Sequence, residues 1–314
     1  MKTKFGAYLQ EWLQIKRGQV SAQTWDTYCQ IVRDYIEPAL GSIRMREITP
    51  HRIQLFYNQK LNEGVGARTV QKIHLLMNAV FKSAVQSGIT GRNPLDVVKT
   101  PKATSTEMKF LDENQVKKLL QTAKETDAWN YALLYLALVT GMRHGELLAL
   151  KWEDVDFDRG TLAVKFSLKR IRGGGLVRKQ PKTKASIRTI KLGAQTVEVL
   201  QGQKERLRTQ QASVGDLWEE TDHVFPSSVG TPRDPSNVIK EFRQILKKAS
   251  LPKIRFHDLR HTAASLMLNN GVEVLAVSQR LGHAKPSITL DVYGHLMPSL
   301  QKEVAERMDS LVTG

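Results

Sequence analysis

The sequence is short of cysteine, of acidic residues and of long apolar runs, and each shortage excludes a class of protein. Cys29 is the only cysteine among 314 residues, which excludes an internal disulfide and a zinc site of clustered cysteines. We expect Cys29 to be a small core residue on a helix, in a protein of the reducing cytosol. No apolar run reaches the roughly 18 residues of a membrane-spanning helix, and residues 1–5 lack the apolar block of a signal peptide.

Acidic residues are outnumbered by basic ones. The chain has 47 Lys and Arg against 31 Asp and Glu, a formal net charge of +16 at pH 7. This excess predicts a polyanionic partner, and DNA is the first candidate. An anionic membrane surface is the alternative, although no amphipathic basic helix dominates the charge. The rest of the composition, 41% hydrophobic and 25% charged, is that of an ordinary globular protein, and the length suits two domains.

The apolar periodicity predicts where these domains lie. Residues 1–98 show helical spacing, with Ser21 as an expected N-cap and Thr49-Pro50 as the start of another helix. We expect residues 99–108 to form an interdomain linker. This linker is either in contact with DNA phosphates or simply solvated. Residues 109–314 begin with helices, turn to short strands between about 155 and 192, and return to helices. The predicted fold is mainly α: an all-α domain followed by an α+β domain with a small antiparallel sheet.

A first motif surrounds Arg143. The buried helix before it is expected to end at Gly141, and Arg143 and Glu146 then share one face of a new helix. A helix start offers free N–H groups and a positive dipole end, which favour a phosphate beside Arg143. The plainer interpretation is a surface ion pair of small energetic value.

A second motif contains His257, Arg260 and His261, which share a helical face at positions i, i+3 and i+4. Two histidines four residues apart also suggest zinc. However, Asp258 stands where a zinc protease has glutamate, and Arg260 on the same face would repel a divalent cation. The plainer interpretation is a polar helix start capped by Asp258.

Two further stretches are weak signals alone. His283 precedes Tyr293 by ten residues, and a helical tyrosine is usually a core residue. Residues 180–190 are basic and are expected on a hairpin, where Lys182 or Lys184 can reach into a groove and donate a proton. The alternative is a solvated basic loop that touches only the DNA backbone.

In this order, the motifs resemble the tyrosine recombinase (phage integrase) family, as found in phages and conjugative transposons. They are Arg143 in TGMRHGELLALKWEDV, His257 and Arg260 in FHDLRHTAASLML, His283 in LGH, and Tyr293 in TLDVYGH. Residues 1–98, with EWL, TWDTY and RNPLDVV, are similar to the family's SAM-like helical core-binding domain. The resemblance covers nearly the whole chain and implies a site-specific DNA recombinase with an α+β catalytic domain over residues 109–314.

The resemblance also implies a role for each matching residue. Tyr293 is the nucleophile that attacks a backbone phosphorus, expels the 5′-hydroxyl and forms a 3′-phosphotyrosyl intermediate. Arg143 and Arg260 hold the non-bridging oxygens. The remaining roles are these: His257 assists proton transfer from Tyr293, His283 donates a hydrogen bond to the phosphate, Lys182 or its rival Lys184 protonates the leaving oxygen, and Glu146 supports the site.

The same resemblance implies no cofactor, metal or ATP, and no GxxxxGK[ST] phosphate loop is present in the sequence. The expected partners are double-stranded DNA, encircled by a clamp, and three further copies of the chain in a tetramer. A DNA-bending or directionality factor is a further expected partner. The amphipathic tail over residues 296–311 packs either into a neighbouring subunit or back on its own. The expected location is the nucleoid of a prokaryotic cytoplasm.

Two rival functions stay open at this point. A type IB topoisomerase shares the chemistry but rejoins the same strand as a monomer. A non-catalytic regulator could use residues 266–281 as a helix-turn-helix, but this leaves Arg143, His257 and Tyr293 without a task. The helical domain begins almost at Met1, so no arm-site binding is expected unless this is a shortened form.

Overall fold

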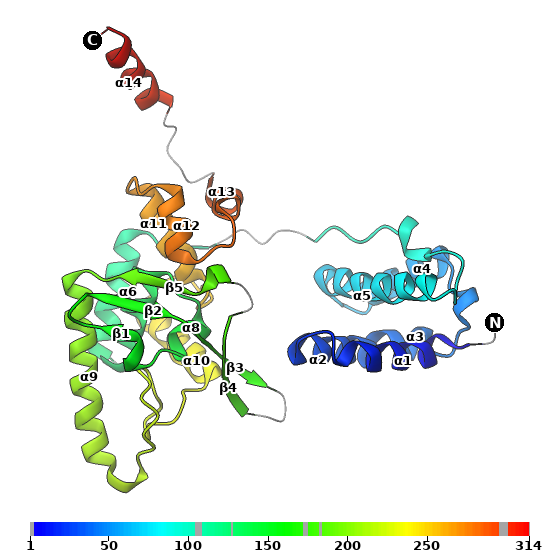
Figure 1. Ribbon diagram of the computed structural model, residues 1–314, viewed down its shortest axis with the longest axis horizontal. Coiled ribbons are helices and arrows are strands. Elements are labelled where there is room, and N and C mark those ends of the chain that lie inside the picture. The colour runs from blue at the N-terminus through cyan, green and yellow to red at the C-terminus, as the bar shows by residue number, and fades with distance from the viewer. Residues whose placement is uncertain are drawn as a thin grey trace. The chain divides into compact units, whose positions relative to one another are not determined.

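The computed structural model describes residues 3–103, 109–126, 128–171, 175–181, 184–294 and 301–313. The chain forms two compact units, residues 1–106 and 107–314, and each is described by itself (Figure 1). The described residues are mostly helical, with short antiparallel strands in the second unit only. The mainly α fold with a small antiparallel sheet, expected from the sequence, is confirmed.

The first unit is all helical. Its helices begin where the sequence predicts, because Ser21 Oγ accepts from the Thr24 N–H and Thr49 Oγ1 accepts from the Arg52 N–H. Its elements are α1 (Phe5–Arg17), α2 (Ala22–Ile31), the π-helix η1 (Val32–Ile36), α3 (Glu37–Leu40), the 3-10 helix η2 (Met45–Glu47), α4 (Pro50–Asn62), α5 (Ala67–Gln86) and the 3-10 helix η3 (Pro94–Val97).

One apolar core joins these helices. Phe5 of α1 stacks on Phe81 of α5 with ring centroids 5.2 Å apart, and Trp12 lies 5.6 Å from Tyr28 of α2. All but Tyr28 are almost fully buried. Cys29 lies on α2, partly buried against this core, as expected. The unit therefore folds around its own core, which burial of large aromatic side chains stabilises.

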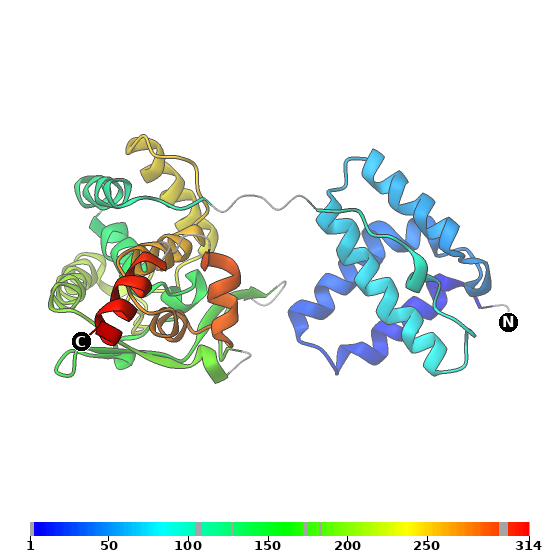
Figure 2. The ribbon, with the colours of Figure 1, turned by 90° about the horizontal axis from the view of Figure 1, so that it is seen from above.

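The second unit is built around α7, whose inward side chains are fully buried and apolar. Helices α6, α9 and α11 all pack against α7 (Figure 2). The predicted buried helix at this position is confirmed. The helices of this unit are α6 (Glu113–Thr126), α7 (Ala128–Thr140), α8 (His144–Leu148), α9 (Ala194–Val214), α10 (Pro235–Lys248), α11 (Asp258–Asn269), α12 (Val274–Leu281), α13 (Pro286–Tyr293) and α14 (Gln301–Thr313), with 3-10 turns η4 (Trp152–Asp154), η5 (Lys184–Ser186) and η6 (Gly215–Leu217).

Two antiparallel sheets occur among the described residues. The three-stranded sheet has the order β1-β2-β5, with β1 (Val155–Asp156), β2 (Thr161–Val164) and β5 (Arg188–Lys191). The second is the hairpin of β3 (Ser167–Ile171) and β4 (Gly175–Lys179), with Lys169 opposite Val177. Strands β3 and β4 are thus inserted between the paired strands β2 and β5. The expected hairpin over residues 180–190 is wrong, because β5 pairs with β2 rather than with β4.

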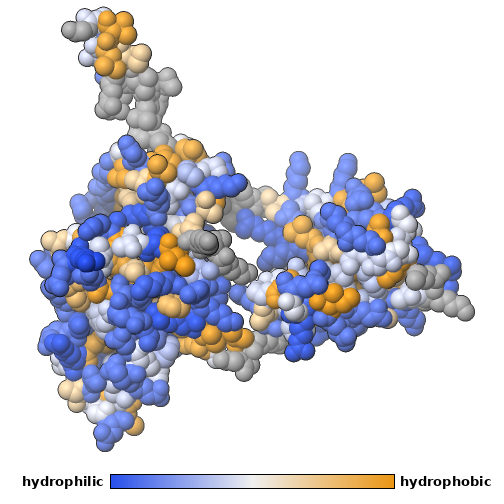
Figure 3. Space-filling model, in the orientation of Figure 1, coloured by the Kyte–Doolittle hydropathy of each residue, from blue (hydrophilic) through white to orange (hydrophobic). Residues whose placement is uncertain are grey.

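The amphipathic tail predicted near the C-terminus corresponds in part to α14. Met308, Leu311 and Val312 are exposed on it, and apolar side chains are visible along this helix in Figure 3. Residues 295–300 lie outside the described part of the chain. Within the described ranges, no helix is long and apolar enough to cross a membrane.

Candidate active site

Arg143 is held at the junction of α7 and α8. Helix α7 ends at Thr140, and Gly141 turns the chain with a φ of +63°. A Cβ at Gly141 would lie 2.3 Å from Leu281 Cδ2, so glycine permits close contact with α12. Arg143 is the N-cap of α8, and its Nη2 donates to the Gly282 carbonyl at 3.4 Å. The turn therefore places Arg143 at the end of α12.

Glu146 fixes the position of Arg143 through hydrogen bonds to its side chain and backbone. Its Oε1 accepts from Arg143 Nη1 at 2.7 Å, and its Oε2 accepts from the Arg143 N–H at 3.0 Å and from Arg188 Nη2 at 3.0 Å. The Glu146 side chain is only 2% exposed, so this is not the surface pair of the plainer interpretation. Burial alone would raise the pKa of Glu146, but the charge of Arg188 and the hydrogen bonds from both arginines outweigh burial and lower the pKa.

Arg188 is a supporting residue that the motif analysis missed. It lies on β5, it is buried, and its Nε donates to the Arg280 carbonyl at 2.7 Å. It therefore links the sheet, Glu146 and the end of α12. The signal was present in the sequence: strand alternation places Arg188 on the same inward face as Ile190, and an inward charge needs a partner.

Arg260 is the most deeply buried cation of the site, at 4% exposure. Its Nη1 donates to the carbonyls of Gly141 at 2.8 Å and Leu281 at 2.7 Å, which fixes the guanidinium plane. Its Nη2 is buried and has no hydrogen-bond partner within the described part of the chain. Burial, and then the charge of Arg143, lower its pKa to about 9, so it stays cationic at neutral pH. A buried unpartnered donor of this kind needs an acceptor.

His283 follows the left-handed cap of α12 at Gly282, which has a φ of +70°. Its Nδ1 lies 2.8 Å from Thr289 Oγ1, which orients the ring. Burial, and then the charges of Arg260 and Arg143, lower the pKa of His283 to about 4. At neutral pH this ring is therefore uncharged and can donate one hydrogen bond from Nε2 when Nδ1 accepts.

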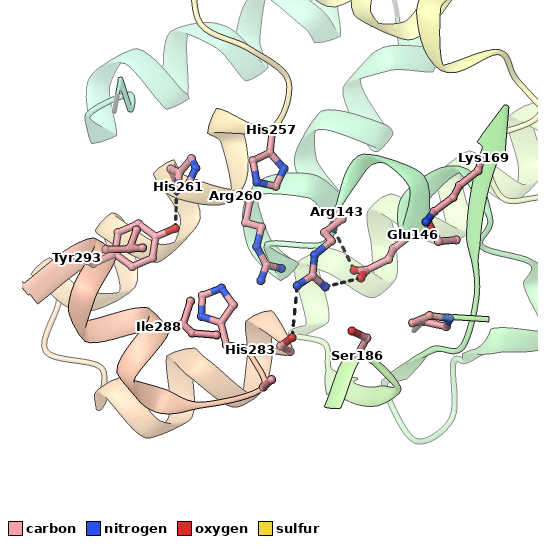
Figure 4. A pocket seen from close by; sticks show the side chains of 15 residues that line it. Arg143, Glu146, Lys169, Ser186, His257, Arg260, His261, His283, Ile288 and Tyr293 are labelled. Atoms are coloured by element: carbon pink, nitrogen blue, oxygen red, sulfur yellow. Dashed lines mark hydrogen bonds and ion pairs between the residues drawn. The ribbon is translucent and has the colours of Figure 1, made fainter. Parts of the chain in front are cut away.

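Tyr293 ends α13 and is 2% exposed. Its Oη lies 2.6 Å from His261 Nδ1, a contact marked in Figure 4. Burial raises the pKa of Tyr293 to about 12, so the hydroxyl is protonated at neutral pH. The sequence placed His261 on the face of His257 but gave it no role. His257 lies behind it, with the two imidazole centroids 5.2 Å apart.

The two lysines expected at the site stay predictions. Lys182 lies outside the described residues, and for Lys184 only the backbone is described, in η5. Lys169 on β3 is a further lysine that lines the site, and the motifs did not indicate it. Alternation along β3 could have indicated it, because Leu168 faces the core while Ser167 and Lys169 share the opposite face.

These side chains meet in one cavity of about 530 Å³. Its lining includes Arg143, Lys169, His257, Arg260, His283 and Tyr293. Figure 4 shows the guanidinium groups of Arg143 and Arg260 facing one another, with His257 and His283 on either side. No group of three or more His, Cys, Asp or Glu side chains suited to a metal ion occurs in the described ranges. The cavity is therefore cationic at neutral pH and fits an oxyanion such as a phosphodiester.

Comparison with known families identifies the chain. The profile of the Phage integrase family matches residues 109–299, which is more than half of the sequence, and the profile "Phage integrase, N-terminal SAM-like domain" matches residues 4–61. The chain belongs to the phage integrase family. The family and the class of activity expected from the motifs, a tyrosine recombinase, are confirmed.

Individual proteins match this chain over nearly its full length. A "Tyrosine recombinase XerC-like" protein of Caldanaerobacter subterraneus subsp. tengcongensis is 30% identical over 325 residues, covering 98% of this chain and 83% of its own. The Tn1549 transposon integrase in complex with transposon right end DNA shares the fold, with a TM-score of 0.84 at 20% identity, covering 99% of this chain and 100% of its own. A lambda integrase tetramer bound to a Holliday junction gives a TM-score of 0.70 at 21% identity, covering 95% of this chain and 78% of its own.

Proposed function

We propose that the cavity is the strand-cleavage site of a site-specific DNA recombinase, with Tyr293 as the nucleophile. The proposal depends mainly on the burial and the hydrogen bonding of Arg260. Its guanidinium is 4% exposed, it has no carboxylate ion pair among the described residues, and its buried Nη2 has no partner there. A buried cation without a counterion is costly unless a ligand supplies the charge. The non-bridging oxygens of a DNA phosphate do so with the planar geometry that arginine prefers.

The chemistry follows from the groups around that phosphate. Arg143 and Arg260 hold the non-bridging oxygens and stabilise the extra negative charge of the pentacovalent transition state. His283 donates a hydrogen bond to the same oxygens. Tyr293 Oη attacks phosphorus in line with the 5′-oxygen, which leaves. The phosphotyrosyl ester keeps the free energy of the broken phosphodiester, so a second 5′-hydroxyl can reseal the strand without ATP.

Two assignments extend the proposal to proton transfer and support. A lysine protonates the leaving 5′-oxygen, with Lys182 as first choice and Lys184 as its rival. His257 borders the cavity with its ring 5.2 Å from that of His261, and we keep for it the assistance in proton transfer from Tyr293 that the sequence predicted. Glu146 keeps the Arg143 guanidinium in place through hydrogen bonds of 2.7 and 3.0 Å to its side chain and backbone. None of these steps calls for a metal ion.

Both units have the charge needed to bind DNA. Residues 1–106 contain 15 Lys and Arg against 7 Asp and Glu, and residues 107–314 contain 32 against 24, an excess of 8 positive charges in each. We assign residues 1–98 to core-site DNA binding, residues 99–108 to the linker and residues 109–314 to catalysis. Phosphate contacts of this kind make binding strong and dependent on salt.

Assembly on DNA is proposed by analogy with the lambda integrase tetramer. Met308, Leu311 and Val312 expose an apolar stripe on α14 that gains stability when covered. A neighbouring subunit or this subunit itself can cover it. A DNA-bending or directionality factor would act on the assembled complex, and the site of action would be chromosomal DNA in a prokaryotic cytoplasm.

Tyr293→Phe tests the proposal directly. The variant loses only the hydroxyl, so it should bind a DNA site with unchanged affinity and form no covalent complex. Tyr35→Phe, in the helical unit, is the matched control and should form the complex at the wild-type rate. Covalent capture by Tyr293→Phe would show that another residue is the nucleophile.

A second experiment separates the proposal from its rivals. Arg143→Ala should cleave at least about 100-fold more slowly, because it removes a donor to the transition state. Its DNA affinity should stay nearly constant, since many other cations contribute. A type IB topoisomerase would relax supercoiled DNA and never join two sites. For a non-catalytic regulator, neither the loss of Arg143 nor the loss of the Tyr293 hydroxyl would change its DNA-binding activity.

A further inference from the structure

The Tyr293 hydroxyl has one side-chain partner among the described residues, and it is His261. The distance from Oη to Nδ1 is 2.6 Å, at the short end for a hydrogen bond between these groups. Figure 4 shows the tyrosine from α13 pointing at the imidazole of α11 at the edge of the cavity that holds Arg260. Both residues line that cavity. His261 therefore touches the atom that would attack phosphorus.

The other two histidines of the cavity are less suited to this atom. His283 Nδ1 is engaged by Thr289 Oγ1 at 2.8 Å. His257 has no hydrogen bond to Tyr293 within the described residues, and its ring meets the ring of His261 edge-on at 5.2 Å. His257 is also more exposed than His261, at the N-cap of α11. The hydrogen bond to the nucleophile thus distinguishes His261 from His257, although both side chains line the cavity.

The charges around His261 favour a neutral ring that can gain a proton. Burial lowers its pKa, the nearby carboxylate of Asp258 raises it, and Arg255 and Arg260 lower it, with a net decrease. His257 on the same helix and His283 beside α13 are themselves largely neutral at pH 7. A neutral imidazole presents a lone pair at Nδ1 to a phenol that is still protonated.

We propose that His261 is a catalytic residue that takes the proton from Tyr293 as the hydroxyl attacks the phosphate. This inference rests on the proposed strand-cleavage function. The Oη–H proton passes to His261 Nδ1, the Oη electron pair forms the bond to phosphorus, and the bond from phosphorus to the 5′-oxygen breaks. The leaving oxygen takes a proton from a lysine or from water. The imidazolium lies near the Asp258 carboxylate, and it returns the proton to Tyr293 when a 5′-hydroxyl reseals the strand.

His261→Asn is the sharpest variant, because an amide can still hydrogen-bond the tyrosine hydroxyl but does not accept its proton at neutral pH. The measurement is the single-turnover rate of covalent complex formation on a nicked suicide duplex between pH 5 and 9. We expect a loss of about 100-fold at pH 7 with unchanged DNA affinity, in the range of general acid–base catalysis. The wild-type rate should level off above the pKa of His261, while the variant rate should keep rising with pH.

Two further measurements keep the test decisive if the variant is also perturbed in structure. A fluorinated tyrosine at position 293, with a more acidic phenol, should restore much of the rate of His261→Asn. A duplex with a sulfur leaving group at the 5′-position needs no acid and should leave the His261→Asn defect in place. His257→Asn should gain nothing from the fluorinated tyrosine.

The outcomes also separate this inference from the proposed function. Wild-type protein that forms the covalent complex, together with a His261→Asn variant that forms it equally fast or faster, overturns the role of His261 and leaves the nucleophile intact. A slow His261→Asn variant that the fluorinated tyrosine does not restore overturns it as well. Wild-type protein that forms no covalent complex on any cognate site overturns the proposed function itself.

Discussion

Glu146→Gln changes the side-chain volume very little, yet the structure predicts that it lowers the free energy of unfolding substantially. The substitution keeps the volume but removes the carboxylate that accepts hydrogen bonds from both Arg143 and Arg188. The Glu146 side chain is 2% exposed and that of Arg188 is 7% exposed, so Arg188 would lose its counterion out of reach of water. Breaking a buried pair on one side costs about 3–5 kcal/mol. We expect the free energy of unfolding to fall by about this amount.

The assay is urea denaturation at pH 7, with Glu153→Gln as the matched control. Glu153 is 60% exposed and pairs with Arg178 at 3.5 Å, so its replacement should change stability by less than about 1 kcal/mol. Combining Glu146→Gln with Arg188→Met removes both charges, and the double variant should be more stable than the sum of the single losses predicts. Equal small effects for Glu146→Gln and Glu153→Gln would refute the reasoning.

The pH dependence of the unfolding free energy tests the Glu146 ion pair independently, because the sign of the effect is fixed. The pKa of Glu146 in the folded protein lies below its ordinary value of 4.5. Its contribution to stability is therefore complete above pH 4.5 and is lost as the pH falls through the folded-state pKa. The difference in unfolding free energy between wild type and Glu146→Gln should be constant from pH 6 to 8 and shrink below pH 4.5. A difference that grows in acid would contradict the ion-pair account.

Four further predictions follow from single features. Burial first, and then the charge of Arg233, lower the pKa of His144 to about 4. The cost of this shift to stability is therefore absent above pH 6.5 and grows as the pH falls toward 4. His144→Gln should lessen the loss of unfolding free energy between pH 7 and 5, measured by denaturation. Gly282→Ala should destabilise more than Gly271→Ala in thermal melts: both have a φ above +60°, but only at Gly282 would the Cβ meet Arg188 Nη1, at 2.9 Å. DNA affinity measured by fluorescence anisotropy should fall at least 10-fold between 50 and about 200 mM salt, and a flat response would argue against backbone contacts. Cleavage should persist in EDTA, and its loss there would contradict a mechanism that needs no metal.

Much of the fold was predictable because the signals are local. Ser21 and Thr49 cap their helices through hydrogen bonds to the residue three positions on, a pattern written directly in the sequence. The nearly continuous apolar stretch of α7 predicts a buried helix, as observed. Arg143 is the N-cap of α8 and Glu146 follows three residues later, so their contact follows from the spacing of a capping box.

The features that the sequence did not predict are those that depend on contacts between distant segments. Arg188 reaches Glu146 only because β5 pairs with β2 across the inserted hairpin, a register that no local pattern specifies. His261 meets Tyr293 across 32 residues of sequence, through the packing of α11, α12 and α13. Lys169 enters the cavity from the inserted hairpin itself. Tertiary packing, rather than spacing along the chain, decides these partners.

The central claim is that Tyr293 becomes covalently joined to a DNA phosphate held by Arg143 and Arg260. The most direct measurement is capture on a nicked suicide duplex, followed by proteolysis and mass spectrometry of the peptide that carries the nucleotide. The account predicts a 3′-phosphate ester on Tyr293 in the wild type and none in Arg260→Lys under the same conditions. An adduct on any other side chain would contradict it.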